Sequence, residues 1–334
     1  MRLSKNLAQG KGNLMAGRCA MKIGIQVKEV NNTSDGQRID NFLIKTCKGV
    51  PKSRIYRAIR SGEVRVNSGR VRADSRIYLG DKVRIPPLNA RNPVRKTSKG
   101  VSQSWSIPIV HEDDHVLVVN KPAGLAVHAG TRHDYGLIEI MQDRMGQDGQ
   151  LQLVHRLDLE TSGCLLLAKS RKMLLKMHSD MASRQHLQKQ YKALVRGNPK
   201  SERMDICIPL GKTKSTDHRV KPDQNGRDSH SILQVEHHYE NSSLLRIDLI
   251  TGRMHQARVH CSELGFPIAG DQRYGDSKFN KCMESYGLNR LFLHADRICF
   301  FDHDDLPVMV NIPLPEPLLN VLDLLQTTVQ TNFG

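Results

Sequence analysis

The stretch LQLVHRLDLETSGCLLLA, residues 151–168, decides the fold of the larger part of this chain. Its apolar ends, residues 151–154 and 164–168, are typical of buried strands, and residues 155–163 between them predict a polar loop at one end of a sheet. Loops on a rigid sheet are where catalytic groups most often lie. Composition by itself nevertheless favours a simpler interpretation, a polar turn in which Asp158 caps its own backbone.

Outward from this stretch, apolar runs recur through the rest of the chain. They predict further strands over residues 107–110, 116–119, 191–195, 244–250 and 291–294. Helices are predicted near residues 137–141 and after Ser170, a candidate N-cap for a helix that turns Leu174, Met177 and Met181 inward. Strands outnumber helices and do not alternate with them regularly, so we predict an α+β fold with a mixed, largely antiparallel sheet.

The polar loop also matches the signature His-Arg-Leu-Asp-x-x-Thr-Ser-Gly, and by it the chain resembles the RluA-type pseudouridine synthases. Further segments resemble that family's other motifs, in the family's order: residues 119–128 (VNKPAGLAVH), 189–193 (KQYKA), 251–260 (TGRMHQARVH), 270–275 (GDQRYG) and 290–295 (RLFLHA). One departure is Ala257, where the family usually has a bulkier aliphatic side chain. The resemblance spans nearly all of residues 105–325 and implies a pseudouridine synthase catalytic domain over residues 106–325.

The resemblance also implies roles for single residues. Asp158 matches the family's catalytic aspartate, and Arg253 matches the arginine that pairs with it and keeps it ionised. Tyr191 matches the aromatic residue that stacks on the target base, an interaction that suits a base flipped out of the RNA. Arg156 and His155 are expected to bind the substrate, Arg156 near the position that the base vacates. Without the resemblance, a structural ion pair, a core tyrosine and a structural histidine remain the simpler interpretations.

The chain's 15 histidines raise the question of a metal site. His237 and His238 are adjacent, and His255 and His260 are five positions apart, which is neither the i, i+4 spacing nor the Cys/His pattern of a zinc site. We therefore predict no metal ligands. We expect no cofactor either, because isomerisation moves no hydride and brings in no group, and the chain has no nucleotide-binding glycine motif.

The formal net charge is +16, and it is unevenly distributed. Residues 1–100 hold 23 Lys and Arg against 6 Asp and Glu, whereas residues 101–334 hold 27 against 28. The whole positive excess therefore lies in the first part, which is typical of a polyanion-binding module joined to a nearly neutral body. A solubilising basic arm is the alternative. A membrane-surface segment fits less well, because no basic helix there carries a broad apolar face.

Residues 36–87 resemble the alpha-L RNA-binding motif, first named in a small-subunit ribosomal protein. The matching residues are 38–43, 53–55, 62–67 and 80–83. One short helix is predicted from Ile39, and a second is predicted after Ser53 as its N-cap. On the second helix Arg54, Arg57 and Arg60 form a ridge, and the resemblance implies that it contacts the RNA backbone. An ordinary solvated helix face is the alternative.

The remaining segments set the domain limits that we expect. Residues 1–35 form an N-terminal extension, in which Met21 is an alternative start, and residues 88–105 form a flexible basic linker rich in Pro, Ser, Asn, Lys and Gly. No apolar run reaches the roughly 20 residues of a membrane span, and no signal peptide is visible. Seven scattered cysteines suit reduced thiols, so we expect a cytoplasmic protein without membrane contact.

Together these features predict an enzyme that isomerises specific uridines to pseudouridine in large-subunit (23S) ribosomal RNA, free or in a pre-ribosomal particle. We expect a monomer. The layout of both modules is most similar to the C group of large-subunit rRNA pseudouridine synthases. Two other functions stay open. A non-catalytic RNA-binding ribosome assembly factor would explain the charge but not the set of Asp158, Tyr191 and Arg253. A glycosidic hydrolase that releases the base could use Asp158 and Glu160 as its two carboxylates.

Overall fold

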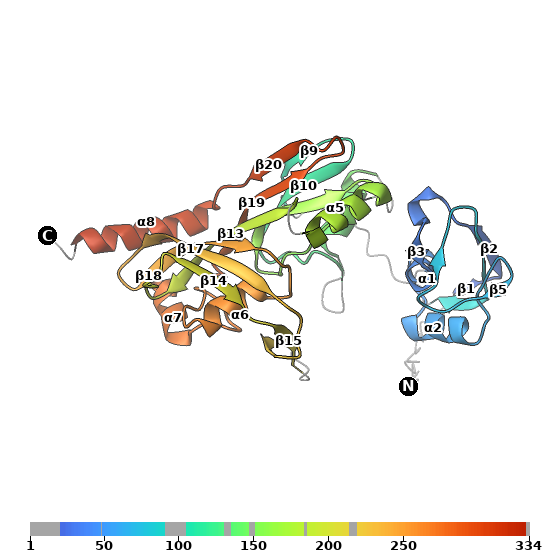
Figure 1. The fold of residues 1–334 in the computed structure, drawn as a ribbon, viewed down its shortest axis with the longest axis horizontal. Helices are drawn as coiled ribbons and strands as arrows, with labels where there is room; N and C mark the ends of the chain where they lie inside the picture. The colour runs from blue at the N-terminus through green and yellow to red at the C-terminus, as the bar shows by residue number, and fades with distance from the viewer. Residues whose placement is uncertain are drawn as a thin grey trace, which may run out of the picture. The chain divides into compact units, whose positions relative to one another are not determined.

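The computed structural model describes residues 21–47, 49–90, 105–129, 135–146, 151–183, 186–213 and 219–331. The chain divides into two compact units, Met1–Lys96 and Thr97–Gly334, each with a hydrophobic core of its own (Figure 1). Within the described residues, no helix is both long and apolar enough to cross a membrane.

The first unit combines two short helices with a small antiparallel sheet. The helices are α1 (Ile39–Thr46) and α2 (Lys52–Arg60), and a 3-10 turn, η1 (Asn32–Ser34), precedes them. The sheet has the order β2-β7-β4-β5, from β2 (Gln26–Glu29), β7 (Lys82–Ile85), β4 (Arg65–Val66) and β5 (Gly69–Arg70). Two further antiparallel pairs join β1 (Met21–Ile23) to β8 (Leu88–Ala90) and β3 (Gln37–Arg38) to β6 (Arg76–Ile77).

The spacing of apolar residues explains how the two helices pack. Ile39 and Leu43 lie one turn apart on α1, as do Ile55 and Ile59 on α2, and all four are buried in the same core. The first helix begins where the sequence predicted it. The second begins at Lys52, before Ser53, and no side chain caps it, so the expected Ser53 cap is wrong.

Strands at the two ends of this unit lie in segments that we expected to be irregular. Gln26–Glu29 pair with Lys82–Ile85 as an edge strand, although we expected them in the N-terminal extension. All four side chains of this strand are exposed, so the sequence shows no alternation that would reveal it. Leu88–Ala90, expected in the linker, pair instead with Met21–Ile23. Residues 1–20 of the expected extension and 91–104 of the expected linker lie outside the described residues.

The second unit is built on a ten-stranded mixed sheet. Eight strands follow in the order β14-β17-β18-β13-β19-β12-β10-β9, while β11 pairs with β12 and β20 with β19. All of these pairings are antiparallel except that of β12 with β19, which confirms the predicted mixed, largely antiparallel sheet. The strands are β9 (Ile109–Glu112), β10 (Val116–Lys121), β11 (Gln152–Leu153), β12 (Ser162–Ala168), β13 (Gln188–Arg196), β14 (Arg203–Cys207), β17 (His230–His238), β18 (Ser242–Leu249), β19 (Leu293–Phe301) and β20 (Pro307–Asn311).

Helices pack on this sheet through side chains that alternate along its strands. On β13, Ala193 and Val195 join the main core, which includes residues of α6, whereas Leu194 joins a second cluster with residues of α7 and α8. Ser170 caps the helix that follows it, as predicted, because its Oγ accepts the N–H of Met173 at 3.2 Å. The helices are α4 (Leu137–Arg144), α5 (Arg171–Ser183), α6 (Gln256–Glu263), α7 (Ser277–Ser285) and α8 (Glu316–Thr331), and a separate hairpin joins β15 (Leu210–Lys212) to β16 (Val220–Pro222).

A close backbone approach fixes the end of the polar loop 155–163. Here β12 meets β19 in parallel, and Gly163 is the register partner of Ala295. Gly163 has φ +108°, and a Cβ built on it would lie 2.1 Å from the carbonyl oxygen of Ala295. Only glycine tolerates both the backbone angle and the contact. The loop can therefore join this parallel strand pair only because residue 163 is glycine.

We expect Gly163→Ala to lower the free energy of unfolding by about 3 kcal/mol, because it adds a steric clash to an unfavourable backbone angle. Urea denaturation measures the change. Gly287→Ala is the matched control, since Gly287 has φ +84° but nothing within 4 Å of its Cβ position. This control carries only the backbone cost of about 1–2 kcal/mol. Equal losses in the two variants would contradict the close approach.

Candidate active site

A cavity of about 720 Å³ lies in the second unit, where the polar loop meets β13 and the start of α6. Asp158, Tyr191, Arg253, Arg156 and His155, which the sequence singled out, all line it. They come from three segments that are far apart in the chain. The sheet brings these segments together because β12 and β13 both pair with β19, and β18, which precedes Arg253, pairs with β13.

The guanidinium that pairs with Asp158 belongs to Arg258. Its Nη1 lies 3.3 Å from Asp158 Oδ2. Arg253, which we expected in this role, instead donates from Nε to the backbone oxygen of Asp228 at 2.9 Å, and its backbone N–H donates to Gln256 Oε1. The reason is local: α6 begins at Gln256, so Arg258 lies in its first turn, whereas Arg253 lies in the turn before the helix. The expected pairing of Arg253 with Asp158 is therefore wrong.

Arg258 is itself held by a second carboxylate. Its Nε and Nη2 donate to the two oxygens of Asp271, each at 2.7 Å, in a bidentate pair. The Asp271 carboxylate is fully buried and also accepts the backbone N–H groups of Arg273 and Tyr274. Burial by itself raises the pKa of Asp271, but the hydrogen bonds and charge of Arg258 outweigh it, so the pKa lies below its ordinary value. Arg258 thus stays charged and aimed at Asp158.

His255 approaches the same carboxylate oxygen of Asp158 as Arg258 does. Its Nε2 is 3.9 Å from Asp158 Oδ2, and its Nδ1 is 2.8 Å from the hydroxyl of Tyr274. The Tyr274 hydroxyl accepts the N–H of Val220, so it can donate its own proton to His255 Nδ1. The proton of the neutral imidazole is then on Nε2, which faces Asp158. Burial lowers the pKa of His255 despite the nearby Asp158, which favours this neutral form. Sequence reasoning assigned no role to His255 or Tyr274.

Lys121 ties the polar loop to the loop that follows β10. Its ammonium is fully buried and donates to the backbone oxygens of Pro122, Leu125 and Leu159, at 2.7–2.9 Å. Burial lowers its pKa to about 7, with the nearby Arg290 as a second cause. Because Leu159 follows Asp158 directly, this contact fixes the backbone beside the carboxylate. Lys121 lies in a segment that the sequence matched to the family, but no role could be assigned from the motif alone.

The aromatic and imidazole groups of the predicted site are both buried. Burial raises the pKa of Tyr191, and the negative charge of Asp158 adds to this, so the hydroxyl keeps its proton. Burial lowers the pKa of His155 to about 3, and its Nε2 accepts the N–H of Leu166 at 3.2 Å. This neutral, backbone-bound ring favours the structural interpretation of His155.

Arg156 is exposed at the cavity, where its charge faces solvent.

The three arginines of α2 do not form one uniform ridge. Arg54 is half-buried, and its Nη2 lies 2.7 Å from Glu63 Oε2, which ties it to the turn after the helix. Arg57 and Arg60 are exposed. The expected ridge therefore presents two arginines to solvent, and Arg54 is engaged within the unit.

Comparisons with known proteins identify the family of this chain. Residues 115–263 match the RNA pseudouridylate synthase family. The chain is 42% identical over 310 residues to "Ribosomal large subunit pseudouridine synthase C" of Escherichia coli (strain K12), covering 90% of this chain and 97% of that protein. The protein of the same name from Vibrio vulnificus is 40% identical over 309 residues, covering 91% and 98%. The chain belongs to the RNA pseudouridylate synthase family, as its motifs predicted.

Two solved human structures are similar to this chain. "Human RNA Pseudouridylate Synthase Domain Containing 1" superposes with a TM-score of 0.54 at 27% identity, covering 63% of this chain and 84% of that one. "Human RNA Pseudouridylate Synthase Domain Containing 4" gives a TM-score of 0.55 at 25% identity, covering 69% and 95%. Both likenesses agree with the mixed sheet of the second unit.

We expect Asp271→Asn to lower the free energy of unfolding by about 3 kcal/mol at pH 7, because it leaves Arg258 without its buried partner. The folded pKa of Asp271 is depressed, so its ionised form stabilises the fold above the unfolded pKa of about 3.9, and this contribution is lost as the pH falls through the folded pKa. The difference between wild type and variant should therefore shrink below about pH 4.

Urea denaturation at several pH values measures this difference. Asp304→Asn is the control, because Asp304 is an exposed aspartate outside the site. If Asp271→Asn cost no more than Asp304→Asn at pH 7, Arg258 would not depend on Asp271.

Proposed function

We propose that this protein isomerises specific uridines to pseudouridine in 23S ribosomal RNA. The observation that carries this proposal is the Asp158 carboxylate, which lies in the family's signature loop, lines the cavity and is paired with the buried Arg258. The ribosomal large-subunit substrate is supported by the names of relatives that match about nine tenths of the chain.

The reaction is an intramolecular transfer. The bond between N1 of uracil and C1′ of ribose breaks, the base turns within the site, and C5 bonds to C1′. The hydrogen on C5 then leaves as a proton, and N1 gains one, so the product is an isomer of the substrate. No electron or group is supplied from outside, and the chemistry therefore requires no cofactor.

Asp158 is the group proposed to act on the reacting nucleotide. A carboxylate can attack as a nucleophile or stabilise the positive charge that develops on a sugar when the glycosidic bond breaks. The adjacent Arg258 guanidinium donates a hydrogen bond to this carboxylate at 3.3 Å and so holds it in place for either role. Arg258 therefore takes the place that the sequence assigned to Arg253.

The cavity suits a nucleotide taken out of the RNA stack. Tyr191 lines it on the sheet side, and an aromatic ring can stack on uracil whatever the base's orientation. Arg156 is exposed at the same cavity and can neutralise a phosphate beside the flipped nucleotide. Single-stranded or looped uridines are the proposed targets, because flipping a base out of a duplex costs a few kcal/mol.

The first unit is proposed as the RNA-binding domain, with its alpha-L motif over residues 36–87. Support comes from its basic composition and from Arg57 and Arg60, which are exposed on one helix. Contacts from such side chains to phosphates add affinity largely without reading sequence. We also propose that the enzyme works as a monomer in the cytoplasm, where its RNA substrate or a pre-ribosomal particle is made.

A non-catalytic assembly factor remains the alternative, but it does not explain why the buried Arg258–Asp271 pair holds the Asp158 carboxylate at an open cavity. A hydrolase using Asp158 and Glu160 is disfavoured by geometry, because Glu160 is exposed and is not among the residues that line the cavity.

We expect Asp158→Asn to lower the rate of tritium release from 23S rRNA labelled at uridine C5 by at least about 10³-fold. Formation of the new C–C bond expels the C5 hydrogen, so release reports the isomerisation itself. Glu160→Gln is the matched control, a carboxylate two positions away that should leave most of the rate intact. The RNA from each reaction is also tested for free uracil.

Each possible outcome decides between the three functions. Release by wild type and by Glu160→Gln but not by Asp158→Asn supports the proposal. Free uracil would identify a hydrolase. Absence of turnover by wild type on rRNA and on pre-ribosomal particles, with RNA binding intact, would identify an assembly factor.

We expect RNA affinity to fall steeply with salt, and the double variant Arg57→Gln/Arg60→Gln to reduce the slope of log K against log salt by about 1–2. With each phosphate contact that is lost, fewer counterions are released when the RNA binds. The rate at saturating RNA should stay unchanged. Lys278→Gln/Lys281→Gln removes the same charge from α7, where both lysines are exposed, and serves as the control. Equal slopes for the two double variants would show that α2 does not contact RNA.

A further inference from the structure

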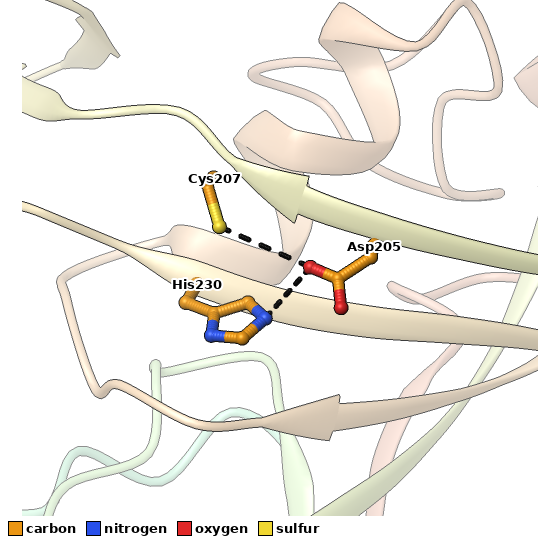
Figure 2. Close-up of side chains that lie close together, drawn as sticks. All are labelled: Asp205, Cys207 and His230. Atoms are coloured by element: carbon orange, nitrogen blue, oxygen red, sulfur yellow. Dashed lines mark hydrogen bonds and ion pairs between the residues drawn. The ribbon is translucent and has the colours of Figure 1, made fainter.

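Three side chains of different chemistry meet at one edge of the large sheet, outside the cavity of the active site. They are Asp205 and Cys207 on β14 and His230 on β17 (Figure 2). His230 Nε2 lies 2.8 Å from Asp205 Oδ1, and the Cys207 thiol donates to the same oxygen at 3.9 Å. One carboxylate oxygen, one imidazole nitrogen and one sulfur all lie within 4.8 Å of one another.

Strand geometry brings these groups together. Asp205 and Cys207 are two positions apart, so their side chains point to the same face of β14. Cys207 is the register partner of His230 in the antiparallel pair, which places the imidazole directly across from the thiol. Since β14 is the edge strand of the sheet, solvent reaches this face.

We propose that Asp205, Cys207 and His230 bind one divalent transition-metal ion of the zinc class, with water as the fourth ligand. Thiolate, imidazole and carboxylate are the three ligand types that zinc prefers, and three protein ligands plus water is the pattern of an open zinc site. The thiolate selects against magnesium and calcium, which take oxygen ligands.

The distances are close to those that a metal requires. Zinc bonds of about 2.0–2.3 Å place the ligand atoms of a tetrahedral site about 3.3–3.8 Å apart. Here the imidazole–carboxylate separation is 2.8 Å, the thiol–carboxylate separation is 3.9 Å, and the thiol and imidazole atoms lie within 4.8 Å of each other, so side-chain shifts of about an ångström suffice. Asp205 and Cys207 are exposed and free of packing on one side, which permits such shifts. A cavity of about 250 Å³, lined by Cys207 and His230, leaves room for the water.

The backbone that carries His230 is already held in place. Its N–H donates to Thr251 Oγ1, and its carbonyl oxygen accepts from Gln256 Nε2, both at 2.9 Å. Gln256 also accepts the N–H of Arg253 in the turn that leads into α6. A ligand on a fixed backbone loses little freedom on binding, so this position favours metal capture. The same hydrogen bonds connect the proposed metal site to the turn before Arg258.

A surface ion pair and a nucleophilic thiol are the competing interpretations of this cluster. An ion pair needs only Asp205 and His230 and gives Cys207 no role. A nucleophilic cysteine needs the imidazole as its base, yet Asp205 is the hydrogen-bond partner of both other groups. In the observed geometry, metal binding engages all three side chains, whereas neither alternative does.

Zinc should protect Cys207 from alkylation in the untagged, full-length protein. Iodoacetamide modification is followed at each cysteine by peptide mass spectrometry, with and without zinc. At free zinc of about ten times the Kd, mass action leaves about one thiol in eleven free, so the rate at Cys207 should fall about 10-fold. Cys282, also exposed, is the internal control, and magnesium in place of zinc should protect neither cysteine.

Variants separate a three-ligand site from binding by the thiol alone. Asp205→Asn and His230→Gln should each weaken zinc protection of Cys207 at least about 10-fold, whereas His237→Gln, an exposed histidine on the same strand, should not change it. Thermal melts confirm that each variant is folded. Protection should also strengthen as pH rises, because zinc displaces the thiol proton.

The proposal is overturned by any of three results. The first is that zinc leaves the alkylation rate of Cys207 unchanged. The second is that zinc slows the alkylation of Cys207 and Cys282 equally. The third is that zinc still protects Cys207 in both Asp205→Asn and His230→Gln. None of these results bears on tritium release, so the metal site and the proposed isomerase activity are tested independently.

Discussion

The buried guanidinium of Arg258 is the interaction on which the rest of the site depends. It bridges two carboxylates, one fully buried in Asp271 and one open to the cavity in Asp158. The bidentate pair with Asp271 fixes the plane of the guanidinium, and this leaves Nη1 directed at Asp158. Removing either member of the buried Arg258–Asp271 pair would leave the other as an uncompensated charge in a low-dielectric environment, which costs about 3–5 kcal/mol. The stability of the fold and the orientation of the Asp158 carboxylate are therefore linked through one side chain.

The backbone around Asp158 is held as firmly as its carboxylate. On one side the ammonium of Lys121 is shielded from solvent and donates a hydrogen bond to the backbone oxygen of Leu159. On the other side Gly163 lets β12 approach β19 at a distance that no other residue allows. These contacts place a polar loop on a rigid sheet, the arrangement that a catalytic carboxylate needs to act without reorganising. The signature loop is thus a structural unit as well as a set of chemical groups.

Several residues could be placed from the sequence, and others could not. Asp158 and Tyr191 follow from motifs, and both line the cavity. The pairing with Asp158 was assigned to Arg253, and Arg258 in the same motif was missed, because spacing along the chain does not show where a helix begins or which way its side chains point. Arg54 was predicted to belong to an RNA-contacting ridge on the helix, but its guanidinium is paired with Glu63 in the turn after α2. In each case a contact between segments decided the role.

Sequence alone was sufficient for the α+β class, the mixed sheet, the family and the loop that carries Asp158, because these depend on apolar periodicity and on motifs continuous in the chain. The partner of Asp158, the environment of His155 and the meeting of Asp205, Cys207 and His230 were decided only in the folded chain. The reason is that strand register and helix onset set these distances: Cys207 faces His230 through a cross-strand pairing that leaves no spacing signal in the sequence.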